Sequence, residues 1–497
     1  MDDEAPLSAP PLKPPLQNKS APRDQEPSGD AEKLRKWHEE RLERKLRGEY
    51  ESAVQHLAEL IHDNSETRMR IANIRVDGAN TTRRSFLAWL IKPHVPESSL
   101  SNLGSVLNTT RSITHILNET DIFASALPTL TISRSPLARD GDIDLIFKTR
   151  ERGKFFLKTA TEFGDGEGNA SVQGKIRNVF GGAEVLEGSV SLGTRTRKAF
   201  NLSLSAPLTS SLKTRGELLA YGLERDYTSF ASCVEGERGV KATIRSLVKG
   251  GIHEFAYEAS LRRIGDLKPT ASLSIRESAG QTLKSAVSHT WSHDTRDDRT
   301  TATRGSYIKT FQELAGLGGD AFFYKSQSNL QLSRPVWRGS TVSFAMRSGV
   351  LWPFFGKASF FPDRFQLGGP LDVRLFKQNS MGPRDGVTML GDADSIGGDL
   401  YWAAGVSLIS DIPWKPHWPL KTHVFVNAGR LDSMDRSKSF VDNVRTCVSQ
   451  PSISSGIGLL YRFDPVRVEL NFGVPLVASK SDGHRRGFQL GIGLDFL

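Results

Sequence analysis

The residue of this chain best placed for chemistry is an arginine in a long loop. Arg374 lies in the run Val373-Arg374-Leu375-Phe376, so its guanidinium is flanked by apolar side chains. The surrounding stretch, from Arg364 to Trp402, is dominated by glycine, proline and aspartate, which exclude a helix or a regular strand over most of its length. Phe365 and Leu367 indicate that the loop packs inside something. A buried arginine needs hydrogen-bond acceptors, so the predicted chemistry is non-covalent anchoring.

Patterns for covalent or metal chemistry are absent from the sequence. The glycines of Gly368-Gly369-Pro370 suggest phosphate binding, but no GxxxxGK[ST] motif or strand-turn-helix context accompanies them. Lipase-type GxSxG and zinc-binding HExxH are missing. Cys233 and Cys447 are the only cysteines and form neither a CxxC motif nor a disulfide framework. We expect no enzyme, no cofactor and no metal.

The composition is compatible with a membrane protein. The chain has 497 residues, 38% of them hydrophobic, and a net charge of +9, which indicates a solvated surface with a slight basic excess and no nucleic-acid partner. Mean hydropathy is −0.35, and no run approaches the roughly 18 apolar residues of a membrane helix. A transmembrane barrel alternates apolar and polar residues, so its mean hydropathy also stays low.

From about 154 onward the hydrophobic pattern has a period of two. On the tract from Val466 to Val474, apolar residues alternate with Arg467, Glu469, Asn471 and Gly473. About sixteen such tracts predict an all-β transmembrane barrel of antiparallel strands. A soluble β-sandwich is the alternative, disfavoured by the length and the near absence of helix. The tracts start near residues 154, 169, 184, 198, 216, 236, 252, 282, 304, 322, 340, 397, 421, 453, 465 and 486.

The membrane environment requires the predicted sheet to close into a barrel. In hydrocarbon every backbone N–H and C=O needs a protein partner, so the first and last strands must meet. An even strand number puts both ends of the barrel on the side of the N-terminal domain. The loop at 352–396 then leaves from the opposite side, between about the eleventh and twelfth strands.

Two segments precede the barrel, which we place at 153–497. Residues 1–66 read as a disordered tail and an amphipathic helix, which either docks on a partner or is simply solvated. Residues 67–152 read as strand, helix, helix, strand, strand, the order of one small α+β POTRA-like domain. The apolar face of the helix comprises Tyr50, Ala53, Val54, Leu57, Leu60 and Ile61.

Four motifs carry a family resemblance. They are Phe365-Gln366-Leu367-Gly368-Gly369-Pro370, Val373-Arg374-Leu375-Phe376, Gly382-Pro383-Arg384-Asp385, and Gly397-Gly398 followed by Tyr401-Trp402. With these motifs the chain resembles the Omp85 superfamily over roughly 67–497, and more closely the central barrel subunit of the mitochondrial sorting and assembly machinery. The resemblance implies that the loop folds back into the lumen and that an arginine, here Arg374, contacts the inner wall.

Three positions depart from the family's pattern. Leu375 stands where many relatives have glycine, Asn427 where bacterial relatives have aspartate, and Ser407 replaces another acidic wall residue. In place of a salt bridge, the expected contact of Arg374 is a hydrogen bond to Asn427 or to backbone carbonyls. The candidate wall partners are Asn427, Ser407 and Phe425.

The resemblance implies an insertase that folds precursor β-barrel proteins into the mitochondrial outer membrane, with the N-terminal domain in the intermembrane space. A pore for polypeptides or solutes is the alternative. The implied partners are unfolded barrel precursors, membrane lipid and two peripheral subunits on the cytosolic face. The seam residues expected to meet clients are Phe155, Phe156, Leu157 and Lys158 on the first strand, and the β-signal-like Gln489, Gly491, Leu494 and Phe496 on the last.

Overall fold

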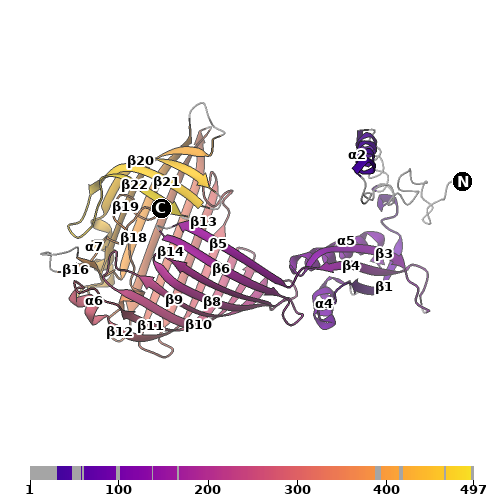
Figure 1. Ribbon diagram of the computed structural model, residues 1–497, viewed down its shortest axis with the longest axis horizontal. Helices are drawn as coiled ribbons and strands as arrows, with labels where there is room; N and C mark the ends of the chain where they lie inside the picture. Colours follow the sequence, from indigo (N-terminus) through magenta and orange to yellow (C-terminus); the bar gives the residue numbers. More distant parts are fainter. Residues whose placement is uncertain are drawn as a thin grey trace. The chain divides into compact units, whose positions relative to one another are not determined.

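The computed structural model describes residues 31–46, 58, 61–96, 101–136, 138–164, 167–337, 339–356, 358–386, 393–412, 418–463, 466–493 and 497. Two compact units divide the chain, Met1–Arg152 and Gly153–Leu497. The first contains a small mixed sheet and the second a large antiparallel sheet (Figure 1).

One helix of the N-terminal arm is described. It is α2, Ala31–Leu46, and its outer positions are exposed. The expected tail at 1–30 and most of the expected apolar face, including Tyr50 and Leu57, lie outside the described residues. Ile61 is described and is 38% exposed.

The rest of the first unit is a four-stranded sheet with two main helices. The sheet order is β2-β1-β4-β3, with β1 and β4 parallel and the outer pairs antiparallel. Both helices bury an apolar face, and Asn102 begins α5 by accepting a hydrogen bond from the Ser105 backbone at 2.9 Å. The predicted POTRA-like order is confirmed. The elements are β1 (Arg68–Asp77), α4 (Arg84–Ile91), η1 (Lys92–His94), β2 (Ser101–Asn102), α5 (Leu103–Glu119), β3 (Phe123–Ile132) and β4 (Asp142–Glu151).

The second unit is built on one sheet of sixteen antiparallel strands, as predicted, and not on the two packed sheets of a soluble sandwich. Its first and last strands, β5 and β22, lie side by side. The strands are β5 (Phe155–Gly164), β6 (Glu167–Arg177), β7 (Val185–Gly193), β8 (Thr196–Pro207), β9 (Thr214–Asp226), β10 (Val234–Val248), β11 (Gly251–Gly265), β12 (Gly280–Asp294), β13 (Gly305–Ala315), β14 (Phe323–Trp337), β15 (Ser340–Pro353), β18 (Leu400–Asp411), β19 (Leu420–Asp432), β20 (Ser452–Phe463), β21 (Val466–Val477) and β22 (Gly487–Gly493).

Side chains alternate between the two faces of this sheet. On β21, Leu470 and Phe472 are 43% and 48% exposed on the outer face, whereas Glu469 and Asn471 are fully buried on the inner face. Successive strand residues point to opposite faces, so each strand gives one apolar outer row and one polar or small inner row. Among the described residues, no helix is both long and apolar enough to cross a membrane.

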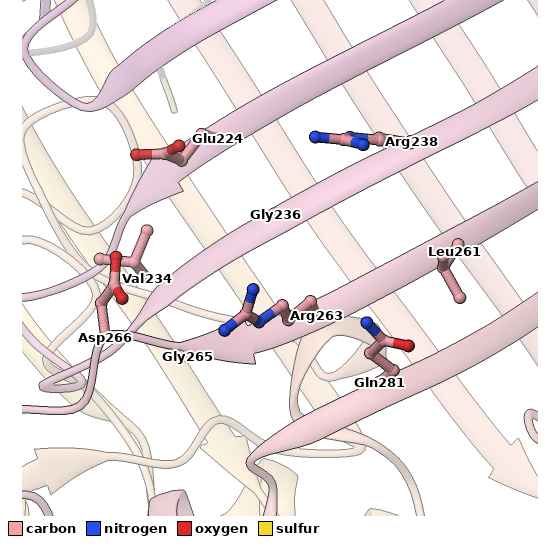
Figure 2. Close-up of a pocket in the computed structure, with 9 residues that line it drawn as sticks. All are labelled: Glu224, Val234, Gly236, Arg238, Leu261, Arg263, Gly265, Asp266 and Gln281. Carbon is pink, nitrogen blue, oxygen red and sulfur yellow. The ribbon is translucent and has the colours of Figure 1, made fainter.

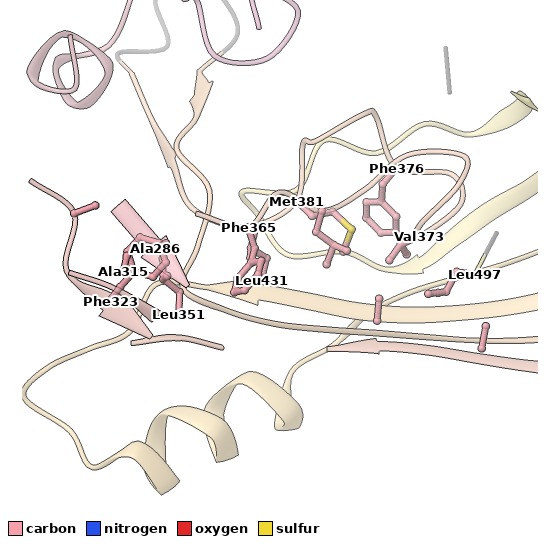
Figure 3. Packing of buried hydrophobic residues seen from close by; sticks show 14 residues of the cluster. Ala286, Ala315, Phe323, Leu351, Phe365, Val373, Phe376, Met381, Leu431 and Leu497 are labelled. Atoms are coloured by element: carbon pink, nitrogen blue, oxygen red, sulfur yellow. The ribbon is translucent and has the colours of Figure 1, made fainter. Parts of the chain in front are cut away.

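The segment between β15 and β18 folds inward and fills part of the lumen. It contains η2 (Phe361–Asp363), β16 (Arg384–Asp385) and β17 (Asp394–Ser395). Two helices lie in other connections of this barrel: α6 (Leu273–Glu277) and α7 (Phe440–Ser449). Figure 3 shows that apolar side chains of the loop and the strands form one buried cluster. Its loop members are Phe365, Leu367, Val373, Phe376 and Met381, and its strand members include Phe323, Leu351 and Leu431.

Candidate functional site

The centre of the candidate site is Arg374, a completely buried side chain. Its guanidinium makes a two-point salt bridge with Glu469: Nε donates to Oε2 at 2.8 Å and Nη2 donates to Oε1 at 3.1 Å. Nη1 donates to the Asn427 side-chain oxygen at 3.2 Å and to the Leu497 carbonyl oxygen at 2.6 Å. The guanidinium carbon lies 5.0 Å from the centre of the Phe425 ring. The loop is thus bound to β19, to β21 and to the last residue of the chain.

The expected contacts of Arg374 are present, but they are not the whole set. Asn427 and a backbone carbonyl accept hydrogen bonds, but Glu469 also supplies a carboxylate from the neighbouring part of the wall. Sequence reasoning placed Glu469 on the polar face of its strand without giving it a partner. Glu469 also receives Arg467 Nη2, and Asn471 Nδ2 at 2.9 Å. One carboxylate therefore holds two buried arginines.

Further polar groups line the wall around this salt bridge. Asn427 Nδ2 donates to the Asp372 carbonyl oxygen at 3.2 Å. His423 Nε2 and Asn471 Oδ1 are 2.7 Å apart. Ser407, the remaining expected wall partner, lies buried on β18 directly opposite Phe425. The wall thus offers fixed acceptors and donors to a loop that would otherwise bury its polar groups without partners.

The backbone at Leu375 explains why a glycine is expected there. Leu375 has φ +66°, a left-handed conformation that bulky residues rarely adopt. The leucine is nevertheless fully buried, and its Cδ1 lies against Gly473 on β21. In the same way, Val373 packs against Gly429 on β19. Glycines on the inner wall allow the loop to approach closely, and this offsets the strain at Leu375.

A methyl group at Gly473 should disturb this packing. Its Cβ would lie 2.3 Å from the Ser455 carbonyl oxygen and 2.7 Å from Leu375 Cδ1, distances that real Cβ atoms do not show. We expect Gly473→Ala to lower the free energy of unfolding by about 1–3 kcal/mol, the usual effect of overpacking. Gly174→Ala on β6 is the matched control, because nothing lies within 4 Å of its Cβ. Equal unfolding midpoints for both variants in detergent would show that the wall at Gly473 accommodates the added methyl group without loss of stability.

The tight turn before Arg374 also depends on glycine. Gly368 and Gly369 have φ +103° and +129°, and Pro370 follows them. The Asn379 N–H donates to the Gly368 carbonyl at 3.0 Å. A Cβ on Gly369 would lie 2.5 Å from Gln378 Oε1. This turn directs Val373, Arg374 and the fully buried Phe376 toward the wall.

The loop also holds the last strand. Gln489 Oε1 accepts from the Leu375 backbone N–H at 2.7 Å, and Gln489 Nε2 donates to the Phe376 carbonyl at 3.0 Å. The Leu497 N–H donates to the Leu371 carbonyl at 3.0 Å. Of the other signal-like residues, Gly491 lies directly opposite Glu469. Leu494 and Phe496 lie outside the described residues.

Other charged contacts bind the loop to the wall away from β21. Asp363 forms a buried two-point salt bridge with Arg262 on β11, at 2.6 and 3.2 Å. Lys325 Nζ on β14 donates to the Asp363 carbonyl at 2.7 Å. Arg347 on β15 pairs with Asp372.

The β16–β17 part of the loop contacts the segment between β11 and β12. There the Ser274 N–H donates to Asp385 at 3.0 Å. Hydrogen bonds from Ser274 hold the pKa of the Asp385 carboxyl below its ordinary value. Together with the contacts on β11, β14, β15, β19 and β21, this shows that the loop is anchored widely across the lumen.

The first strand has no comparable support. Phe155, Phe156 and Leu157 are 78%, 46% and 72% exposed, and Lys158 is exposed as well. β5 forms a ladder with β6. Within the described parts of the two strands, no residue pairing joins β5 to β22, although they are adjacent.

A sixteen-stranded barrel with an inward-folded, wall-anchored loop and a POTRA-like unit defines a class of transmembrane β-barrel proteins. A solved structure with this fold is BamA from Haemophilus ducreyi lacking POTRA domains 1–3. Its TM-score is 0.72 at 17% identity, and the match covers 85% of this chain and 84% of that one.

Sequence comparison identifies the family. Residues 178–496 match the Omp85 superfamily domain. A SAM50-like protein of Schizosaccharomyces pombe is 32% identical over 457 residues, covering 90% of this chain and 95% of that protein. The human sorting and assembly machinery component 50 homolog is 31% identical over 362 residues, covering 71% of this chain and 76% of that protein. The chain belongs to the Omp85 superfamily, among its SAM50 proteins.

Proposed function

We propose that this protein folds and inserts precursor β-barrel proteins into the mitochondrial outer membrane through the seam between β5 and β22. The observation that carries the proposal is the unequal support of the two seam strands. β22 is held from inside by Gln489 and Leu497, whereas β5 is exposed on both faces and has a described ladder only with β6. An unpaired strand edge is a template for another strand.

The chemistry is non-covalent. Each unpaired backbone group in hydrocarbon costs several kcal/mol, so a lone strand entering the bilayer meets a large barrier. Pairing with the edge of β5 satisfies these groups one after another as the client strand enters. The lumen loop is anchored on β11, β14, β15, β19 and β21, so opening at the seam need not disturb the rest of the sheet.

The strand that a client presents should resemble the chain's own last strand. Gln489, Gly491, Leu494 and Phe496 have the polar, glycine and spaced hydrophobic residues of such a signal. We infer that a client signal takes the place of β22 beside β5. The N-terminal unit then lies in the intermembrane space, and two peripheral subunits act on the cytosolic face.

A pore for solutes or polypeptides is the other candidate. A conducting lumen needs an open path along its axis, but here a loop with a buried apolar cluster occupies part of it. The anchoring of that loop on β11, β14, β15, β19 and β21 favours a fixed structural element over a gate.

Depletion of the protein from cells distinguishes the two functions. We expect newly made outer-membrane barrel proteins to accumulate in unassembled form, measured on native gels. Import of a matrix protein in the same mitochondria serves as the control and should stay normal at early times. Normal barrel assembly together with altered solute passage would support the pore and exclude the insertase.

A further inference from the structure

A hollow of about 260 Å³ lies on the outer face of the barrel, on strands β9 to β12 near the loops that follow β9 and β11. Figure 2 shows Arg238 and Arg263 projecting over it from β10 and β11, with Glu224 and Asp266 at one end and Leu261 at the other. None of these residues belongs to the lumen site.

Strand register explains why the hollow exists. Glu224, Gly236, Arg263 and Gln281 form one row across the four strands. Gly236 has no side chain, and a Cβ built on it would meet nothing within 4 Å. A gap therefore separates Glu224 from Arg263 in the row. The next row toward the middle of the barrel contains Arg238 and Leu261 as direct neighbours.

The hollow is at the edge of the outer apolar surface. Val240, Leu261 and Leu283 face outward there and are 57%, 45% and 43% exposed. Arg263 lies two residues beyond Leu261, about 7 Å along the strand. The two guanidiniums therefore lie where an apolar belt ends and polar headgroups begin.

The hollow is lined by two arginines and two carboxylates. Arg238 and Arg263 have no hydrogen-bond or ion-pair partner among the described residues, although both face the hollow. Glu224 lies 3.7 Å from Arg197 and is partly neutralised. Asp266 lies beyond the end of β11, on the side away from the apolar belt.

We propose that this hollow binds a membrane phospholipid with a zwitterionic headgroup. The phosphate lies between Arg238 and Arg263, whose planar guanidiniums match phosphate oxygens. The headgroup cation, which extends past the phosphate into water, faces Asp266 and Glu224. The acyl chains lie along Leu261 and Leu283. This site is independent of the seam and of the insertase function.

The test is native mass spectrometry of the full chain released from detergent after titration with phospholipids of identical acyl chains. The wild type should retain phosphatidylethanolamine in preference to phosphatidylglycerol. Gly236→Leu should reduce binding about tenfold, because the space at its Cβ is open and a leucine side chain would occupy the hollow. The double variant Arg238→Ala/Arg263→Ala should do the same, because it removes two charged contacts.

Two further variants make the result specific. Arg215→Ala/Arg245→Ala removes two arginines that lie opposite each other on β9 and β10 but face the lumen, so lipid binding should not change. Asp266→Asn should shift the preference toward phosphatidylglycerol. Equal lipid retention by all variants, or tighter binding of phosphatidylglycerol to the wild type, would overturn the proposal.

Discussion

Glu469→Gln is expected to lower the free energy of unfolding by about 3–5 kcal/mol, the usual effect of removing one partner from a buried ion pair. Arg374→Met should lower the free energy of unfolding by a smaller amount. The reason is the geometry: Glu469 holds both Arg374 and Arg467, so its loss removes a carboxylate contact from two buried cations at once. Loss of Arg374 leaves Glu469 paired with Arg467 and Asn471. Denaturant unfolding of the full chain in detergent measures both variants.

A double-mutant cycle isolates the interaction. In the variant Arg374→Met/Glu469→Gln, the combined effect should be smaller than the sum of the single effects, because the pair is in direct contact. Arg197→Met is the control: its pair with Asp226 on the outer face is 40% exposed at the arginine, and such pairs contribute about 0–1 kcal/mol. If Arg374→Met proves as harmful as Glu469→Gln, the shared role of Glu469 is refuted.

A disulfide across the seam should stop insertion of client barrels while leaving this barrel folded. Single cysteines at Phe155 to Ala160 are combined with single cysteines at Leu490 to Gly493, and oxidation should join the pairs whose Cα atoms lie within about 7 Å. The background replaces Cys233 and Cys447 with alanine, since both thiols are buried and alanine adds no polar group there. Reductant should restore client assembly.

The matched control joins the same last strand to its other neighbour. Leu470 and Leu490 lie directly opposite each other on β21 and β22 and both face outward, so Leu470→Cys/Leu490→Cys adds a disulfide without closing the seam. This variant should still assemble clients at the wild-type rate. Normal assembly by a fully oxidised seam variant would mean that lateral opening is not the mechanism, and clients would then pass through the lumen or a thinned bilayer.

The sequence by itself determined the barrel. Lipid on one side and a polar lumen on the other impose a period of two on the hydrophobicity of each strand. Hydrocarbon cannot hydrogen-bond backbone N–H and C=O groups, so the strands must pair with one another in a closed sheet. The predicted starts near 340, 397 and 465 therefore lie close to the observed Ser340, Leu400 and Val466. Glycine and proline likewise marked the loop, because neither tolerates a regular strand there.

Only the tertiary structure decided the contacts. The alternating pattern marks the polar inner positions of a strand but does not show which of them a loop residue contacts. The pairing of Arg374 with Glu469 could therefore be identified only from the strand register and the path of the loop. These two residues are 95 positions apart. The φ of +66° at Leu375 is tolerated because Gly473 lies beneath it, and the outer hollow exists because Gly236 stands in one row with Arg263. Each feature depends on which residues face each other across strands, and these pairings cannot be predicted from the residues of a single strand.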